Sequence, residues 1–166
     1  MKFTDVKEIY QTQASRRGLP AWTYNNDELT RLEMEQVFLR NWLFVAHVSD
    51  IPNSGDYQCF AIADERAVVV RDRDGAVRAF HNLCRHRASR IVADDKGHCG
   101  NAFICPFHGW SYNLDGSLRN IPKADSFPEI DRQEYGLKSL DCEIWHGMIF
   151  VRFGGDGLAG FDMMPE

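Results

Sequence analysis

Apolar residues follow a helical spacing near the N-terminus and then change to short extended runs. Asn26 and Asp27 are good helix-capping residues, and the apolar residues after them recur at roughly helical intervals, at Leu29, Leu32, Val37 and Phe38. We therefore expect one helix near residues 27–40. Beyond it, turn residues separate the runs WLFVAHV, YQCFAIA and RAVVVR. This alternation predicts β-strands for most of the remaining chain.

Two Asp-Gly pairs mark expected hairpin turns. Asp74-Gly75 separates RAVVVR from AVRAF, and Asp115-Gly116 separates WSYNL from SLRNI. Both pairs favour tight turns, because aspartate and glycine tolerate the backbone angles that such turns need. Residues 121–136 contain two prolines and many polar groups, which predicts a loop. Strands are then expected in LKSLDCEIW and GMIFVRF.

Composition and charge place the chain among ordinary soluble globular proteins. Its 166 residues are 44% hydrophobic, which is enough for one domain with a real core. The 19 basic and 24 acidic side chains give a net charge of -5, which argues against general binding to nucleic acid. No apolar run is long enough for a signal-peptide core or a membrane span. We therefore expect a cytoplasmic protein with no membrane partner.

The cysteines and histidines include two closely spaced mixed pairs. The pairs are Cys84-x-His86 and Cys105-x-x-His108, and 18 residues separate them. In a reducing compartment, cysteines at such spacings are better candidates for metal ligands than for disulfides. One tight loop can present each pair, and a strand at NAFIC can bring the two loops together. The spacing therefore predicts one site with four metal-ligating side chains.

Three kinds of chemistry compete for these four residues. Zinc accepts two thiolates and two imidazoles, but its structural sites usually take two cysteines or two histidines from each loop. A catalytic Cys-His nucleophile pair would leave the other two residues as a coincidence. An iron–sulfur cluster with two cysteines on one iron and two histidines on the other agrees with the ligand count and with the mixed pairing. The cluster is favoured, and a zinc-stabilised binding module is a remote alternative.

The residues around both pairs resemble the Rieske proteins, and most closely the N-terminal Rieske domain of the large (alpha) subunit of aromatic ring-hydroxylating oxygenases. Residues 82–87 are similar to that family's N-x-C-x-H-R, and residues 105–110 are similar to C-P-x-H-G-W. The stretch SYNLDGSL after the second loop and RNWLFVAH at residues 40–47 are similar as well. Ala88 departs from the pattern, since glycine is common there, and the spacer between the pairs is slightly longer than usual.

The resemblance implies a fold and a domain organisation. The fold is all-β, a Rieske-type antiparallel β-sandwich with an inserted cluster-binding subdomain and one N-terminal helix. Residues 1–40 would form a helical arm, and residues 41–154 the Rieske [2Fe-2S] domain. The glycine-rich residues 155–166 would form a linker or the start of a catalytic domain that this sequence does not contain.

By the same resemblance, the four ligands divide between the two irons of a Rieske [2Fe-2S] cluster. Cys84 and Cys105 would hold the inner iron, while His86 and His108 would hold the outer iron near the surface. The outer iron would then be the port for single electrons. Trp110 would shield the cluster from water.

Two positions in the loops bear on the reduction potential. Respiratory Rieske proteins carry an extra cysteine in each loop, joined by a disulfide, and a serine that hydrogen-bonds a bridging sulfur. Ser89 and Phe107 stand here in place of those cysteines. We therefore expect a potential near the low end of the Rieske range, about -150 mV rather than about +300 mV. Such a potential suits reduction by an NADH-linked reductase or a ferredoxin.

The residues for oxygen activation are not in this sequence. The family uses a mononuclear Fe(II) held by two histidines and a carboxylate, and no Asp/Glu-x-x-His-x(4)-His run occurs here. No catalytic residue is therefore assigned. We expect the electron-transfer part of an oxidoreductase, a ring-hydroxylating or related Rieske non-haem iron oxygenase, inactive alone and trimeric when complete. The resemblance implies an aromatic acid or a quaternary amine as substrate, and a stand-alone Rieske ferredoxin is the alternative.

The other cysteines and histidines are expected to be structural, although the loop of Cys99 could approach the cluster. They are Cys59, Cys99, Cys142, His47, His81, His98 and His146. Near the first loop, Arg85, Arg87, Arg90 and Lys96 give a local positive excess. A solvated loop is the default explanation for this patch. The alternative hypothesis is that it steers an acidic electron donor toward the outer iron.

Overall fold

The computed structural model describes residues 18–154, which divide into an N-terminal unit ending at Val37 and a larger unit beginning at Phe38. In chain order the elements are η1 (Ala21–Tyr24), α2 (Asp27–Gln36), η2 (Phe38–Arg40), β1 (Leu43–His47), η3 (Val48–Asp50), β2 (Asp56–Ile62), β3 (Glu65–Arg71), β4 (Val77–His81), β5 (Lys96–His98), β6 (Ala102–Ile104), β7 (Ser111–Asn113), β8 (Leu118–Asn120), η4 (Ala124–Ser126), β9 (Asp141–Trp145) and β10 (Met148–Arg152). The predicted linker at 155–166 lies outside the described residues. Among residues 18–154, none of the helices has the length and apolar character that a membrane crossing requires.

The predicted helix is confirmed, but it is shorter than its hydrophobic pattern. Helix α2 begins where the side chain of Asn26 accepts a hydrogen bond from the Leu29 N–H at 2.8 Å. The expected end at residue 40 is wrong. The chain leaves the α-helix at Val37 and continues as the separate 3-10 turn η2.

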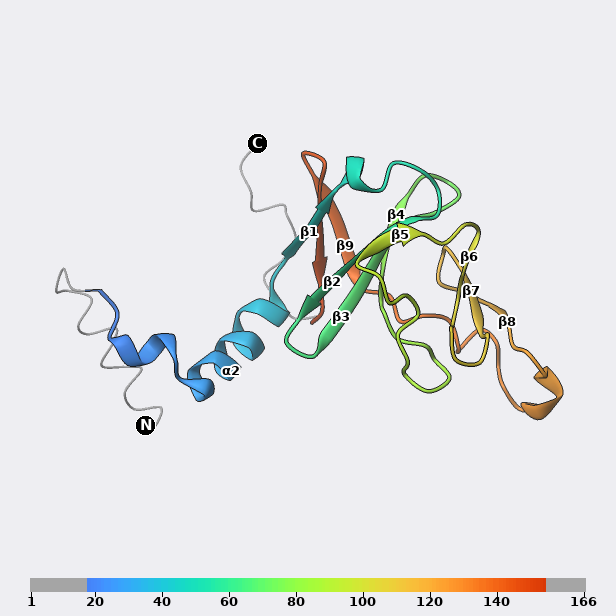
Figure 1. Cartoon of the computed structure of the whole chain (residues 1–166), viewed down its shortest axis with the longest axis horizontal. Coiled ribbons are helices and arrows are strands. Elements are labelled where there is room, and N and C mark those ends of the chain that lie inside the picture. Colours follow the sequence, from blue (N-terminus) through green and yellow to red (C-terminus); the bar gives the residue numbers. More distant parts are fainter. Residues whose placement is uncertain (1–17, 155–166) are drawn as a thin grey trace. The chain divides into compact units, whose positions relative to one another are not determined.

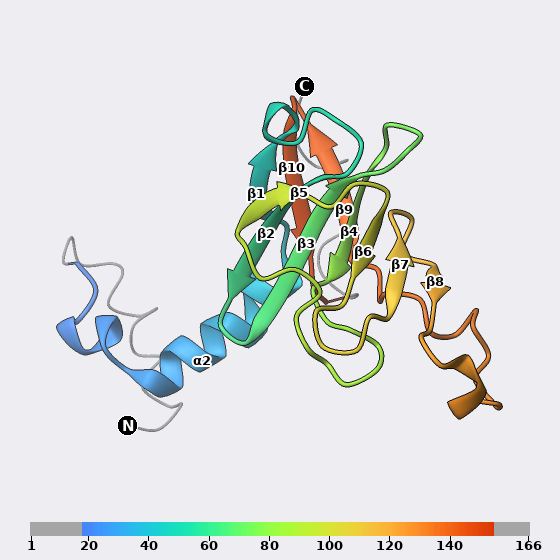
Figure 2. The same cartoon turned by 45° about the vertical axis from the view of Figure 1, so that its right-hand side comes forward.

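The strands of the described residues pair in three antiparallel sheets. Their strand orders are β1-β10-β9, β4-β3-β2-β5 and β6-β7-β8. Figures 1 and 2 show β2 and β3 side by side through the body of the larger unit. The all-β fold and its antiparallel pairing are therefore as predicted.

Strand β3 packs against a hydrophobic core on each of its faces. Ala67 and Val69 belong to the core that contains Ile149 of β10, whereas Val68 and Val70 belong to the core beneath the two loops. Successive side chains of a strand point to opposite faces, and all four are 0% exposed. The uninterrupted apolar run in RAVVVR thus reflects a central sheet that is buried on both sides.

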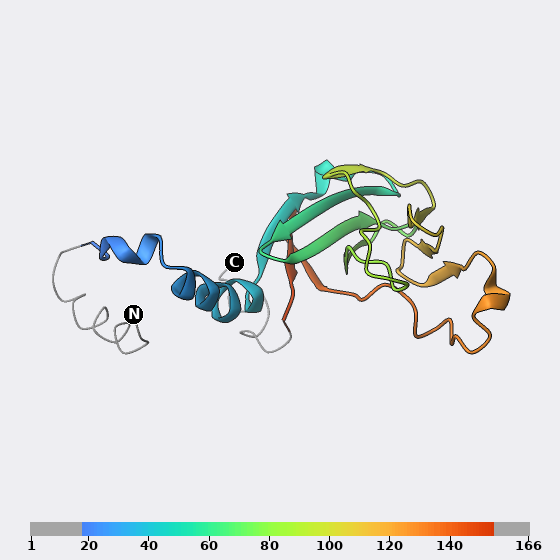
Figure 3. The ribbon, with the colours of Figure 1, turned by 60° about the horizontal axis from the view of Figure 1, so that its bottom comes forward.

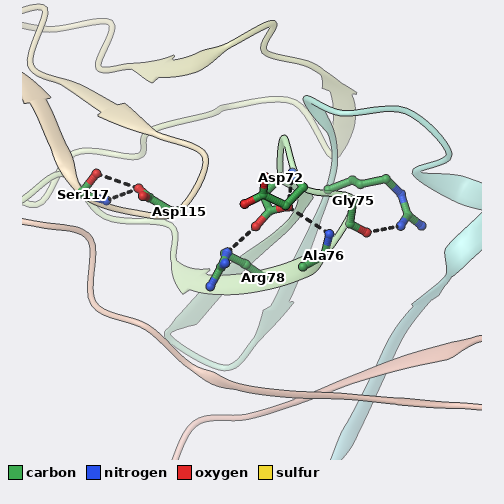
Figure 4. A network of polar contacts seen from close by, with 8 residues as sticks. Asp72, Gly75, Ala76, Arg78, Asp115 and Ser117 are labelled. Carbon is green, nitrogen blue, oxygen red and sulfur yellow. Dashed lines mark hydrogen bonds and ion pairs between the residues drawn. The ribbon is translucent and has the colours of Figure 1, made fainter.

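The β3–β4 turn, the first of the Asp-Gly hairpins, is confirmed and holds a buried carboxylate (Figure 4). Asp72 is 2% exposed, and its Oδ1 accepts hydrogen bonds from the N–H groups of Asp74 and Ala76 at 2.9 Å each. Its Oδ2 accepts from the guanidinium of Arg78. A buried charge is tolerated only with such donors, so this network fixes the turn.

The β7–β8 hairpin is confirmed as well. Asp115 accepts hydrogen bonds from the N–H of Ser117 at 2.9 Å and from its hydroxyl at 2.6 Å. These bonds lower the pKa of Asp115 below its ordinary value of 3.8. Gly116 has φ +87°, and a Cβ atom there would collide with the ring of Phe80. Glycine is therefore required both by the backbone and by packing.

The predicted loop at 121–136 is confirmed, with the single 3-10 turn η4 inside it. Figure 3 shows this segment leaving the strands after β8 and returning to β9. Phe127, Ile130 and Tyr135 from the excursion pack against the core that lies under the two loops. The long loop thus forms one wall of the region where the predicted ligands lie.

Candidate metal centre

A buried asparagine closes the base of the first loop, which joins β4 to β5. Asn82 is 3% exposed, and its Oδ1 accepts hydrogen bonds from the N–H of Ile91 at 2.9 Å and of Val92 at 3.1 Å. Its Nδ2 donates to the carbonyl of Val92 at 2.9 Å. Inside the loop, the N–H of Cys84 donates to the carbonyl of Ser89 at 2.7 Å. These bonds fix the position from which Cys84 presents its sulfur.

Ala88 turns the first loop back on itself in a left-handed conformation. Its φ is +54°, and its N–H donates to the carbonyl of Cys84 at 2.9 Å. An L-residue adopts this region at a cost that glycine avoids. This conformation explains why glycine is favoured at the position where this chain has alanine.

The second loop joins β6 to β7 and is equally tight. The N–H of Cys105 donates to the carbonyl of Trp110 at 2.8 Å, and the N–H of Gly109 donates to the carbonyl of Cys105 at 3.0 Å. Gly109 has φ +72°, which reverses the chain directly after His108. The C-P-x-H-G-W motif therefore encodes a closed turn that presents one sulfur and one imidazole.

The two cysteines of the motifs lie together under the loops. Cys84 is 3% exposed and Cys105 is 2% exposed, and each thiol influences the pKa of the other. Each sulfur also contacts one hydroxyl. The Oη of Tyr112 lies 3.3 Å from the Sγ of Cys84, and the Oγ of Ser89 lies 3.2 Å from the Sγ of Cys105.

The surroundings of the two thiols differ electrostatically. Burial raises the pKa of Cys84. Burial acts in the same direction on Cys105, but hydrogen bonds from the Ser89 hydroxyl and from the N–H groups of Phe107 and His108 outweigh it and lower its pKa. The second loop therefore favours the thiolate, which is the form of a cysteine that a metal would bind.

The two histidines of the motifs form a second pair. The ring centroids of His86 and His108 are 4.8 Å apart, with the planes at 82°. His86 stacks on Trp110 at 5.0 Å and 7°, and the ring of Phe127 meets its edge at 5.8 Å. Burial, with the positive charges of Arg87 and His108, lowers the pKa of His86 and favours the neutral imidazole.

The environment of one ring nitrogen of His86 indicates whether this site fits a metal. The Nδ1 of His86 is buried and has no hydrogen-bond partner among the described residues. A buried polar atom without a partner is costly, and a neutral imidazole nitrogen is a good metal ligand. The donor set of two thiols and two imidazoles also fits a two-iron cluster. Within residues 18–154, no group of three or more Cys, His, Asp or Glu side chains is arranged so that it could hold one metal ion.

The remaining cysteines lie outside this group. Cys59, Cys99 and Cys142 are half-buried, and burial raises the pKa of each thiol to about 11. The thiol of Cys99 donates to the carbonyl of Gly55 at 3.3 Å. These are the properties of inert packing residues.

The remaining histidines each have an interaction of their own. His47 caps η3, and His81 lies 3.5 Å from a carboxylate oxygen of Glu65. His98 bonds Asp56 at 2.8 Å. His146 occupies the β9–β10 turn with φ +48° and packs on Trp145.

Three residues that support the site were not singled out by sequence reasoning. Asn82 and Tyr112 lie within the motif stretches but were given no role, and Ser89 was considered only as the replacement of a cysteine. A buried polar residue next to a ligand is the signal that could have identified them. Their partners lie 9 to 28 residues away along the chain, so the sequence did not show what they bind.

An antiparallel sandwich with a thiol pair and an imidazole pair on two adjoining loops is typical of an iron–sulfur domain with mixed ligands. Residues 41–141 match the Rieske [2Fe-2S] domain. The chain belongs to this family, and its cofactor is a [2Fe-2S] cluster.

Curated relatives agree with this assignment. The alpha subunit of benzene 1,2-dioxygenase from Pseudomonas putida is 35% identical over 153 residues, which are 92% of this chain and 33% of that protein. The oxygenase subunit of glycine betaine monooxygenase from Chromohalobacter salexigens is 38% identical over 144 residues, 87% of this chain and 32% of that protein. The chain therefore spans about one third of the length of these relatives.

Solved structures show the same fold. Naphthalene 1,2-dioxygenase from Rhodococcus sp., bound to indole, matches with a TM-score of 0.86 and 28% identity over 94% of this chain and 36% of that chain. A quaternary ammonium Rieske monooxygenase in complex with L-carnitine matches with a TM-score of 0.80 and 29% identity, over 88% of this chain and 41% of that chain. The predicted Rieske-type fold is confirmed.

Proposed function

We propose that Cys84, His86, Cys105 and His108 are the ligands of the cluster, with the cysteines on the inner iron and the histidines on the outer iron. The observation that carries this proposal is the buried, unpartnered Nδ1 of His86 beside a second imidazole and a pair of buried thiols. When bound, the cluster supplies a carrier for one electron at a time.

The protein gives the two histidines different surroundings. Trp110 stacks on the ring of His86 and Phe127 meets its edge, so His86 is half-buried, whereas His108 is exposed. Exposed Phe107 stands next to His108, with ring centroids 6.2 Å apart. We therefore expect electrons to enter and leave on the side of His108.

Iron and sulfide analysis of the purified chain tests the ligand assignment. We expect two irons and two sulfides per chain, and loss of both in His86→Ala and in Cys105→Ser. His98→Ala is the matched control, because this exposed histidine is paired with Asp56 outside the site, and it should retain the cluster. Bound zinc without sulfide, or a cluster that survives replacement of both His86 and His108, would overturn the assignment.

We infer that the chain is the electron-transfer part of a ring-hydroxylating or related Rieske oxygenase that acts in the cytoplasm. The names of its relatives support an aromatic compound or a quaternary amine as the substrate of the complete enzyme. Its partners would be a reductase or ferredoxin donor and further copies in a trimer, and the mononuclear Fe(II) would lie in a catalytic domain outside this sequence. A stand-alone ferredoxin is the second candidate.

An immunoblot of the source cells separates the two candidates. An antibody against this chain should detect a protein several times larger than 166 residues if the chain is part of an oxygenase. A single band at the size of these residues alone would support the ferredoxin.

The basic patch offers a test of the electron donor. Arg87 and Arg90 are exposed, whereas Arg85 lies over the ring of Tyr135 at 5.9 Å. Arg90 is therefore the cleaner site for a charge reversal. If the patch attracts an acidic donor, Arg90→Glu should slow cluster reduction and weaken its dependence on salt. The matched reversal Arg73→Glu, at the other end of β4, should change neither quantity, and equal rates in both variants would refute the steering role.

A further inference from the structure

Each of the two buried thiols at the candidate centre contacts one side-chain hydroxyl. Ser89 belongs to the first loop, and its Oγ lies 3.2 Å from the sulfur of Cys105 in the second loop. Tyr112 follows the second loop, and its Oη lies 3.3 Å from the sulfur of Cys84 in the first loop. Each thiol therefore contacts a hydroxyl from the other side of the site: Cys105 contacts Ser89 of the first loop, and Cys84 contacts Tyr112 of β7, directly after the second loop.

The chemistry of a ligating sulfur decides which atom donates. A cysteine that binds iron is a thiolate without a proton, so the hydroxyl must donate and the sulfur must accept. For Tyr112 the structure gives an independent indication, because the N–H of Arg85 donates into its Oη at 3.0 Å. That bond leaves the phenolic proton free to point at Cys84.

The backbone holds Ser89 in place for its contact. Its carbonyl accepts from the N–H of Cys84 at 2.7 Å, and the left-handed turn at Ala88 directly before it directs the chain back toward the second loop. Ser89 is also half-buried, so water competes weakly for its hydroxyl. The contact is therefore held by the loop itself and does not depend on a mobile surface side chain.

We propose that the hydroxyl of Ser89 raises the reduction potential of the cluster by donating a hydrogen bond to the thiolate of Cys105. This inference rests on the ligand assignment proposed above. On reduction one electron arrives from the donor protein, no covalent bond forms or breaks, and the proton stays on the Oγ of Ser89. The added negative charge spreads onto the sulfur ligands, so the hydrogen bond is stronger in the reduced state.

Redox titration of the cluster-loaded chain tests the proposal with an isosteric pair of variants. Ser89→Thr keeps the hydroxyl. Ser89→Val has a methyl group in place of that hydroxyl, and valine has nearly the same shape as threonine. We expect the potential of Ser89→Thr to stay near that of the wild type. In Ser89→Val the equilibrium constant for reduction should fall about tenfold, which is about 59 mV for one electron.

Controls separate this inference from the proposed function. Ser117→Ala removes a serine hydroxyl from the β7–β8 turn, where its partner is Asp115, and should leave the potential unchanged. Equal potentials in Ser89→Val and Ser89→Thr, both with full iron and sulfide, would overturn the role of Ser89 and leave the ligand assignment intact. A wild-type chain that binds no iron and sulfide would overturn the ligand assignment itself. If Ser89→Val binds no cluster, Ser89→Ala is compared with Ser89→Thr instead. Loss of the cluster from both Ser89→Val and Ser89→Ala would show that Ser89 has a structural role and would overturn the proposal.

Discussion

Replacing Ala88 by glycine should stabilise the protein, although it shortens a side chain. Ala88 has φ +54°, a conformation that costs an L-residue about 1–2 kcal/mol and that glycine adopts freely. Glycine in turn gives the unfolded chain more freedom, which opposes the gain by about 0.4–1 kcal/mol. Ala88 is exposed, so the deleted methyl group buries little surface. The net expectation is a gain of about 0.5–1 kcal/mol.

The assay is thermal unfolding of the cluster-loaded chain, followed by circular dichroism at one fixed scan rate. For a chain of this size, the expected gain corresponds to a rise in midpoint of about 1–4 °C. Two further variants make the measurement specific. Ala63→Gly removes the same strain at the β2–β3 turn, where φ is +47°, and should also raise the midpoint. Ala61→Gly, at an exposed position inside strand β2, should lower it.

The combination of signs decides whether the reasoning holds. A higher midpoint for Ala88→Gly and Ala63→Gly with a lower one for Ala61→Gly would show that backbone conformation is the cause. A fall in midpoint for Ala88→Gly would refute it, because the left-handed turn would then carry no removable strain. The iron content of each variant is measured in parallel, and it should equal that of the wild type because glycine preserves the loop.

Three further predictions concern the hairpins and one surface pair. Gly116→Ala should destabilise the protein by about 2–4 kcal/mol, since the new methyl group collides with Phe80 at a positive φ, and a midpoint within error of the wild type would contradict this. Asp72→Ala should lower the free energy of unfolding by about 2–4 kcal/mol, measured in urea, because it leaves two N–H groups and a guanidinium without their acceptor. Asp72→Asn keeps one acceptor oxygen and should cost less. Equal losses of stability in the two variants would show that the hydrogen bonds are unimportant. The hydrogen bond from His98 lowers the pKa of Asp56 below 3.8, so this pair stabilises the fold above pH 3.8 and the effect is lost as the pH falls through the lowered pKa. The difference in midpoint between the wild type and Asp56→Asn should therefore be present near neutral pH and shrink below pH 3.8, and a difference that persists in acid would disprove the linkage.

Local chemistry makes several features of the fold predictable from the residues alone. The helix start at Asn26 and the two Asp-Gly hairpins depend on contacts within a few residues, and the structure confirms them. The predicted helix end is wrong because the apolar spacing continues through Phe38 although the backbone changes to a 3-10 turn. Propensity and periodicity do not report such a change, since it is decided by how the next segment packs.

The sequence by itself determined the chemical character of the site. Cys84-x-His86 and Cys105-x-x-His108 supply two thiols and two imidazoles, which are the proposed donor groups. Their spacing within tight turns favours a two-iron cluster over a zinc site, because coordination depends on local geometry. Only the tertiary structure decided which groups surround those donors. The hydroxyls of Ser89 and Tyr112 reach sulfurs 16 and 28 residues away along the chain, and contacts at such separations exist only once the sheets have packed and brought the two loops together.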